Sequence, residues 1–193
     1  MAVQHWEAEQ RVLDDRSAEV AKALTGEGVD AGGIAVARGE HALWVGVAAL
    51  IEPRRGAGHY QGGSAGVSVP VHVGGMRVRV GQNRGHYVAG PEVQTPVDRG
   101  RVVVTDRRVV FVGAKATREW AYTKLIAMTS TTDGSGVLLH VSNRDKVSGL
   151  VVDRPASLEY FVAVGQHVVE NGVRATVDAA EAAAEAHRSQ QPV

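Results

Sequence analysis

The fold of this chain is decided by the stretch GRVVVTDRRVVFVG, residues 100–113. Two runs of apolar residues, 102–104 and 109–112, flank the polar segment Thr105–Arg108. Valine favours the pleated surface of a strand, and a short polar segment between two such runs is typical of a β-hairpin. Because apolar residues occupy consecutive positions, we expect both faces of each strand to be buried. The stretch therefore predicts a hairpin of central strands.

Short valine-rich stretches recur on both sides of this hairpin. They lie at 42–51, 67–73, 76–80, 101–105, 108–113, 117–121, 123–129, 136–141 and 147–152. In 67–73, valines alternate with other residues, among them Pro70, so this stretch predicts an edge strand or a bulge. No alternation of strands and helices occurs between His41 and Asp153, which excludes a doubly wound parallel sheet. We expect an antiparallel β domain.

Helical patterns flank the β region. The first, at 6–24, has a narrow apolar stripe formed by Trp6, Leu13, Val20 and Leu24. The second, at 154–171, follows Asp153, which we expect to be its N-cap, and has Pro155 in its first turn. The third, at 176–188, is alanine-rich with almost no large apolar side chain, so we expect a loosely attached helix.

These patterns predict three segments. Residues 1–40 form an acidic N-terminal helix and a Gly/Ala-rich linker, residues 41–172 a β domain with a capping helix, and residues 173–193 an alanine-rich tail. The fold class is mainly β with flanking helices.

Charge and composition exclude several classes of function. The 193 residues include 21 basic and 21 acidic ones, so the formal net charge is zero and a nucleic-acid partner is not expected. The charge is unevenly placed: residues 1–40 are net −4 and 153–193 net −3, whereas 77–124 hold ten basic and four acidic residues, net +6. The absence of cysteine excludes disulfides, thiolate metal sites and cysteine nucleophiles.

The cellular location that we expect for the chain follows from the targeting and membrane-spanning features that its sequence lacks. It begins without a basic region and apolar stretch, and its longest apolar run, 42–51, is about half the length needed to cross a bilayer. We expect a cytoplasmic protein, or a peripheral one at the inner face of the membrane.

No motif in the sequence predicts catalysis. Residues 62–66 match Gly-x-Ser-x-Gly, but a strand pattern follows where a nucleophile elbow needs a helix, so we interpret them as a Gly-rich loop. The eight histidines show no metal-ligand spacing, and neither a metal nor another cofactor is expected. An enzyme with an unrecognised pocket, using His59, His86 or Ser64, is the weakest of the alternatives.

Residues 100–113, followed by 117–120 (TREW) and 124–126 (KLI), resemble bacterial PH-like and GRAM-like modules. Those modules share a glycine, an apolar strand, Thr, a short turn, Arg, and an apolar strand with Phe and Gly. Residues 53–55 (PRR), 60–64 (YQGGS) and 80–81 (VG) fit the same pattern, so the resemblance covers about residues 41–170. It implies a PH-like bent antiparallel sandwich or barrel capped by a C-terminal helix, here with added terminal helices.

The resemblance also implies where an anion would bind. PH-type modules that bind phosphoinositides carry an early basic residue and then Arg-x-Arg, because residues two apart on a strand share one side. The expected lysine is missing here. The candidate residues for an anion or headgroup are Arg54, Arg55, Arg77, Arg79, Arg101 and Arg108. For Arg108 the structural alternative is an ion pair with Asp98 or Asp106.

Two binding functions follow from this interpretation. The favoured one is a non-enzymatic scaffold that engages a protein partner or a second copy of itself, since a sheet edge or helix groove accepts a peptide without special residues. The apolar stripe of residues 6–24 is a candidate surface for self-association. The alternative is peripheral binding of anionic lipid headgroups through the Arg-rich strands.

Overall fold

The computed structural model describes residues 2–57, 59–61, 69–73, 76–80, 86–88 and 90–191. The chain forms two compact units. The first comprises Met1–Glu52 and Pro96–Val193, and the second is Pro53–Thr95. The structure thus divides the chain within the predicted β domain and keeps both terminal helices with the sheet.

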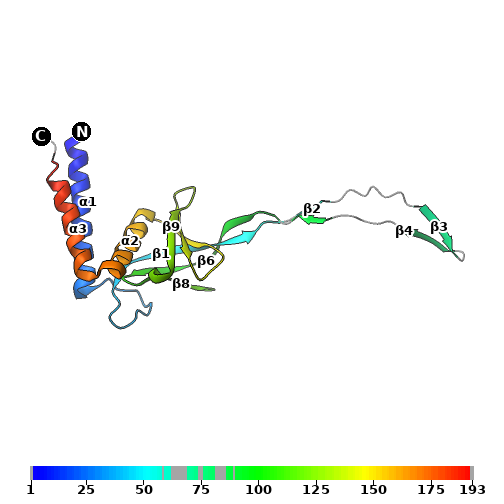
Figure 1. The fold of residues 1–193 in the computed structure, drawn as a ribbon, viewed down its shortest axis with the longest axis horizontal. Coiled ribbons are helices and arrows are strands. Elements are labelled where there is room, and N and C mark those ends of the chain that lie inside the picture. Colours follow the sequence, from blue (N-terminus) through cyan, green and yellow to red (C-terminus); the bar gives the residue numbers. More distant parts are fainter. Residues whose placement is uncertain are drawn as a thin grey trace. The chain divides into compact units, whose positions relative to one another are not determined.

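The first unit is built on a curled, seven-stranded antiparallel sheet that forms a half-barrel (Figure 1). Its strands are β1 (Ala42–Arg55), β6 (Glu92–Thr105), β7 (Arg108–Gly113), β8 (Thr117–Ala121), β9 (Leu125–Ser130), β10 (Gly136–Val141) and β11 (Ser148–Val152). The order across the sheet is β8-β7-β6-β1-β11-β10-β9. Two meanders, one of four strands and one of three, therefore meet where β1 pairs with β11, with Ala48 opposite Val152. This confirms a β+α fold with an antiparallel sheet.

The β6–β7 hairpin is the predicted pair of central strands. Val103 lies opposite Val110, and Val102, Val104, Val109 and Phe111 are fully buried. The valines are buried on consecutive positions, as the sequence predicts. The Tyr122 hydroxyl, from the short 3₁₀ helix η2 (Tyr122–Lys124), donates to the Thr105 carbonyl at 3.1 Å and holds the hairpin end against the core.

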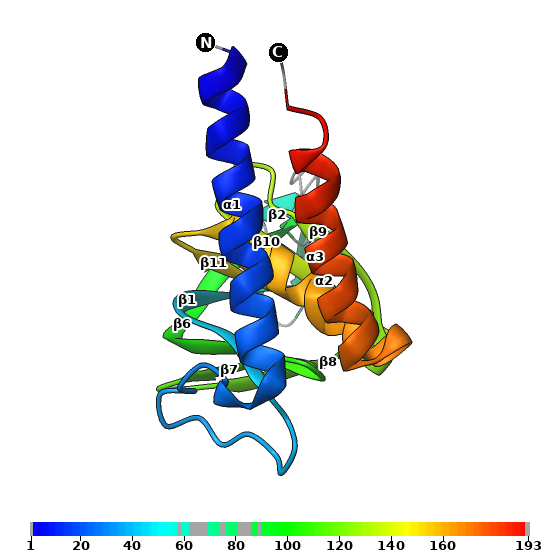
Figure 2. The same ribbon diagram turned by 90° about the vertical axis from the view of Figure 1, so that its left-hand side faces the viewer.

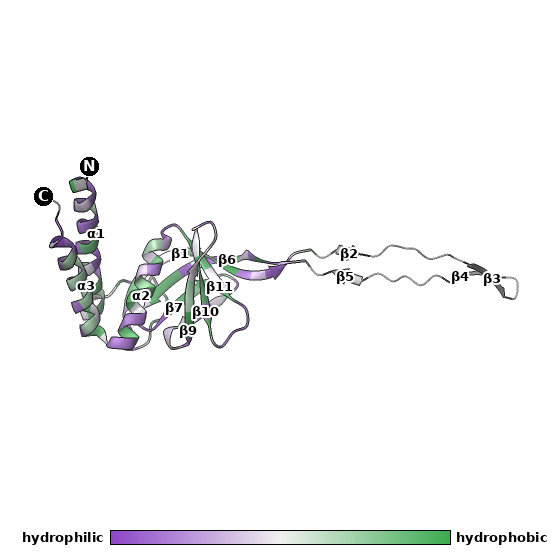
Figure 3. Ribbon diagram, turned by 45° about the horizontal axis from the view of Figure 1, so that its top comes forward, coloured by the Kyte–Doolittle hydropathy of each residue, from purple (hydrophilic) through white to green (hydrophobic). Residues whose placement is uncertain are grey.

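Helix α2 (Pro155–Asn171) closes the curled sheet, because it contacts strands of both meanders, β7, β10 and β11. Its buried face includes Leu158, Phe161 and Val162. Figure 3 shows hydrophobic segments in the strands of the sheet and in α2, alternating with hydrophilic ones. The helix is preceded by Arg154 at the N-cap, not by Asp153 as expected, and no side chain caps it.

Helices α1 (Ala2–Lys22) and α3 (Val173–Arg188) lie side by side and antiparallel, so both described chain ends lie at one end of the pair (Figure 2). A π-helical turn, η1 (Ala23–Glu27), follows α1. The expectation of a loosely attached tail is wrong. The Gln10 side-chain amide donates to the Ala184 carbonyl at 3.1 Å, and Ala184 itself is buried. The side chains along α3 are small, so the backbones of α1 and α3 can approach each other closely. Large apolar side chains are therefore not needed for the two helices to pack.

The apolar stripe of residues 6–24 packs against other parts of the same chain. Trp6 stacks on His187 of α3 with ring centroids 5.3 Å apart, and Val20 and Leu24 belong to the main core. The stripe is therefore not the free surface for self-association that the sequence suggested. None of the helices in the described part of the chain is both long and apolar enough to cross a membrane.

In its described residues the second unit contains two short antiparallel ribbons besides the end of β1 and the start of β6. Strand β2 (His59–Gln61) pairs with β5 (His86–Val88), and β3 (Val69–Val73) pairs with β4 (Met76–Val80). In the described residues β3 has β4 as its partner, with Pro70 opposite Arg79, which agrees with the predicted edge strand. The Gly-x-Ser-x-Gly match at 62–66 lies outside the described residues.

Candidate functional site

The sheet of the first unit ends in two edge strands, β8 and β9. An edge strand exposes a row of backbone N–H and C=O groups that can pair with another chain, and proteins usually guard such edges with charge, proline or a covering segment. The two edges of this sheet differ in that protection.

The β8 edge is guarded by charge and by contacts. Arg118 pairs with Glu52 (Nη2 to Oε1, 2.6 Å), and Glu119 accepts from Arg108 (2.9 Å). Arg144, in the turn after β10, donates from Nη2 to the Glu119 carbonyl at 2.7 Å and lies over the Trp120 ring, 5.8 Å from its centroid. A guanidinium thus occupies a carbonyl of β8 and obstructs a further strand.

The β9 edge has no such protection. Its sequence, LIAMTS, contains neither a charged residue nor a proline. The side chain of Ile126 is 71% exposed, and Ala127, Thr129 and Ser130 are exposed as well. On the inner side β9 pairs with β10, with Met128 opposite Leu139, and the structure places no strand of the described chain on its other side.

Helix α2 contacts the end of β9. The Ser130 hydroxyl donates to Glu159 of α2 at 2.8 Å. An edge of six uncharged residues with helix α2 beside its last residue is a surface on which an extended peptide can add a strand. Main-chain hydrogen bonds would supply affinity there, and the exposed Ile126 an apolar contact.

Arg108, at the start of β7 in the β6–β7 hairpin, forms ion pairs with two carboxylates of the same chain. Its Nε and Nη2 donate to the two carboxylate oxygens of Glu40, each at 2.8 Å, and its Nη1 to Glu119 at 2.9 Å. The sequence suggested Asp98 or Asp106 as the structural partner, which is wrong. Asp98 accepts backbone N–H groups of the β7–β8 turn, and Asp106 binds His41, Oδ2 to Nδ1 at 3.1 Å.

The electrostatics of this pair are those of a structural ion bridge. Burial raises the pKa of Glu40, but hydrogen bonds from Arg108, the Ala37 N–H and Thr105 outweigh burial and lower the pKa below its ordinary value. The hydrogen bonds from Arg108 to Glu40 raise the pKa of Arg108. Arg108 is therefore cationic and already paired, with a side chain 25% exposed.

The other candidate arginines are dispersed. Arg101 of β6 donates to the Gly32 carbonyl in the linker after η1. Arg54 and Arg55 lie at the end of β1 in the second unit, where Arg55 Nε is 3.6 Å from Glu92 Oε1. Arg77 and Arg79 lie on β4. The structure thus places four of the six in the second unit and two in the first.

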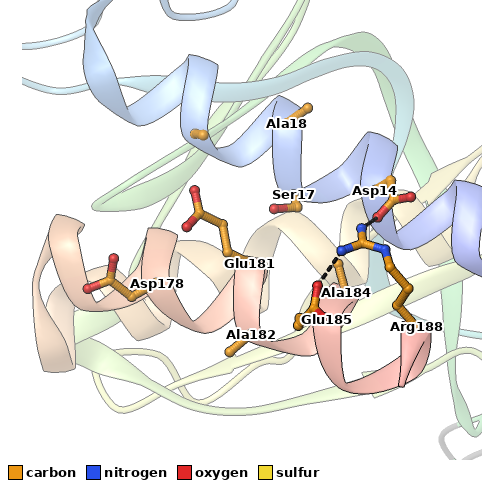
Figure 4. A pocket seen from close by; sticks show the side chains of 10 residues that line it. Asp14, Ser17, Ala18, Asp178, Glu181, Ala182, Ala184, Glu185 and Arg188 are labelled. Atoms are coloured by element: carbon orange, nitrogen blue, oxygen red, sulfur yellow. Dashed lines mark hydrogen bonds and ion pairs between the residues drawn. The ribbon is translucent and has the colours of Figure 1, made fainter. Parts of the chain in front are cut away.

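A groove of about 640 Å³ runs between α1 and α3 (Figure 4). Its lining includes small residues, among them Ser17 and Ala18 of α1, and the carboxylates Asp178 and Glu181 of α3. Arg188 bridges Asp14, at 2.8 Å, and Glu185. One guanidinium therefore neutralises two of the groove's carboxylates and ties the helices together.

Sequence reasoning missed β9 as a candidate site. The available signal was the lack of charge at 125–130, next to the charged stretch 117–121, but which strands end a sheet depends on pairing between distant segments. In the described ranges no three His, Asp or Glu side chains come close enough to hold a metal ion. Comparison with models of known families and with characterised proteins finds no match.

Proposed function

We propose that this chain is a non-enzymatic binding module whose β9 edge accepts an extended strand of a protein partner. The observation that carries the proposal is the contrast between the two edges of one sheet. Strand β8 is charged and occupied by Arg144, whereas β9 is uncharged and exposes Ile126. The resemblance of residues 100–126 to PH-like modules supports the proposal further, since it implies a binding role.

Peptide selection tests the proposal directly. A displayed library of random heptapeptides is selected on the full chain, and hydrogen exchange is measured with each selected peptide. We expect protection of the β9 amides, because strand addition pairs them with the peptide backbone. Ile126→Lys with Thr129→Lys should weaken binding about tenfold or more, since lysines on an edge oppose strand addition.

The matched control is Val47→Lys. Val47 is also an exposed apolar residue of the sheet, 68% exposed, but it lies on the central strand β1. Peptides should bind this variant as they bind the wild type. Selected peptides that protect another segment, or that bind the double-lysine variant equally well, would contradict the proposal. Light scattering at low and moderate salt shows whether a second copy of the chain is itself the partner.

A specific feature of the second unit favours lipid headgroups as a second candidate. In the β3–β4 ribbon the register pairs Val69, Val71 and Val73 with Val80, Val78 and Met76, and it pairs Pro70 and His72 with Arg79 and Arg77. Residues 53–95 hold five arginines against one glutamate. A segment with this excess of positive charge and many valines is suited to an anionic membrane surface. Vesicles with anionic phospholipid should bind the chain at low salt and release it as salt rises.

A further inference from the structure

A second concave site lies where the end of α1, the start of β1 and the start of α2 meet. Its volume is about 400 Å³. Its apolar lining includes Ala23, Leu43, Trp44 and Phe161, which are nearly fully buried, and the exposed Val29 in the loop after η1. A cavity of several hundred Å³ with an apolar lining and few polar groups is the usual form of a small-molecule site.

Arg154 is the charged residue of this pocket that is suited to an anion. Lys22 and Glu19, which have opposite charges, also line the pocket. The Arg154 side chain makes no hydrogen bond or ion pair with another residue that the structure describes. A guanidinium without a partner, beside an apolar cavity, is available to a ligand.

The start of α2 adds to this positive potential. Arg154 is the N-cap of a 17-residue helix that has no side-chain cap and no acidic residue in its first turn. The N-terminal end of a helix carries a partial positive charge, and here no carboxylate of the first turn offsets it. The cationic side chain and the helix end therefore act on the same side of the pocket.

We propose that this pocket binds a small apolar monocarboxylate. The hydrophobic body would lie against Trp44 and Phe161, and the carboxylate would accept two parallel N–H bonds from Arg154, which matches carboxylate geometry. A carboxylate brought out of water needs such a charged partner, whereas the apolar body gains by leaving it. The site shares no residue with the β9 edge, so it does not depend on the function proposed for that edge.

The three tryptophans of the chain provide the readout. Trp44 lines the pocket, whereas the indole N–H of Trp6 donates to the His187 carbonyl and that of Trp120 to Ser148. The labelled full chain is titrated with 4-phenylbutyrate and with octanoate, and the three indole N–H signals are followed by NMR. We expect the Trp44 signal to shift saturably while the other two stay in place. The corresponding neutral amides should bind at least about tenfold more weakly than the acids.

A pair of arginine variants separates the specific contact from a general effect of charge. Arg154→Gln should weaken carboxylate binding about tenfold. Arg174→Gln, at a residue of α3 that is 91% exposed and pairs with Asp178, should leave binding unchanged. The proposal is overturned if neither acid shifts the Trp44 signal at millimolar concentration, or if all three indole signals shift together. Equal binding of acid and amide to the wild type would also overturn it, and so would equal binding of the acid by the two variants.

Discussion

Glu40 connects the β6–β7 hairpin with the linker that precedes β1. Its carboxylate is almost fully buried, binds Arg108 through both oxygens and accepts the Ala37 N–H at 2.7 Å. Thr105, at the end of β6, lies 2.8 Å from the same carboxylate. A buried charge is tolerated only when hydrogen bonds satisfy it, and here three separate segments supply them.

Glu40→Gln should lower the free energy of unfolding by about 2 kcal/mol at neutral pH, because it removes the charged partner of Arg108. The lowered pKa of Glu40 means that its contribution is present above its ordinary value of 4.5 and is lost as pH falls through the folded-state pKa. The difference between variant and wild type should therefore narrow on acidification. Urea denaturation at neutral pH and at successive pH values below 4.5 measures it.

The exposed Glu7→Gln serves as the control for this experiment, since the Glu7 side chain is exposed and its carboxylate takes no part in the Glu40 network. A destabilisation by Glu40→Gln that stays constant from neutral to acid pH would contradict the assignment of an ionised, paired Glu40.

At the scale of elements, close backbone approach explains packing that composition does not suggest. Helix α2 carries Gly165 in its middle, where glycine lowers helix propensity. A Cβ at this position would stand 2.6 Å from the Thr105 carbonyl oxygen and against the Tyr122 ring. Gly165 therefore lets α2 approach the end of the central hairpin. Helix α3 approaches α1 by the same means, with Ala184 buried between them.

Gly165→Ala should destabilise the protein by about 1–3 kcal/mol, although alanine is the better helix former, because the added methyl group collides with backbone. Ala163→Gly, at an exposed position of the same helix, should cost about 1 kcal/mol through propensity alone. Thermal unfolding of both variants checks the pair. A gain in stability from Gly165→Ala would show that α2 does not pack as closely as the structure has it.

At the scale of the whole molecule, the second unit is an insertion in the chain between two neighbouring strands of the sheet, β1 and β6. Its chain leaves from β1 and returns to β6, and near these points the Gly56 N–H donates to the Pro91 carbonyl at 2.9 Å. The residues of the main core all lie in the first unit. The first unit should therefore fold without most of the insertion.

Replacing residues 57–90 by Asn-Gly should keep cooperative unfolding and change the melting temperature by less than about 4 °C. The same variant should lose binding to anionic vesicles, because it lacks the β3–β4 ribbon. Removal of residues 173–193 is the contrasting deletion, and it should destabilise the first unit by exposing the α1 face that α3 covers. If the variant without residues 57–90 unfolds, the expected independence of the first unit is contradicted. If it still binds vesicles like the wild type, the expected role of the β3–β4 ribbon is contradicted.

The sequence by itself determined the strands, the helices and the class of the fold. Valine-rich runs separated by turn residues predict β1, β3, β4 and β7–β11 to within a few residues, and the helical periodicity predicts α1 and α2. Of β6 (Glu92–Thr105) they predict only the last part, 101–105. These features are local, because β-branched residues, turn chemistry and helical spacing act over a few positions along the chain. The sequence missed β2 and β5, which are three residues each and lie among glycines.

The tertiary structure alone decided which groups became partners and which surfaces stayed open. It paired Arg108 with Glu40, 68 residues away, and it placed Trp6 of the α1 stripe against His187 of α3, 181 residues away. It also made β9 an open edge and gathered Trp44, Phe161 and Arg154 around one pocket. Contacts of this kind depend on how distant segments pair and pack. Local periodicity carries no information about that arrangement, and the two proposed binding sites arise from it.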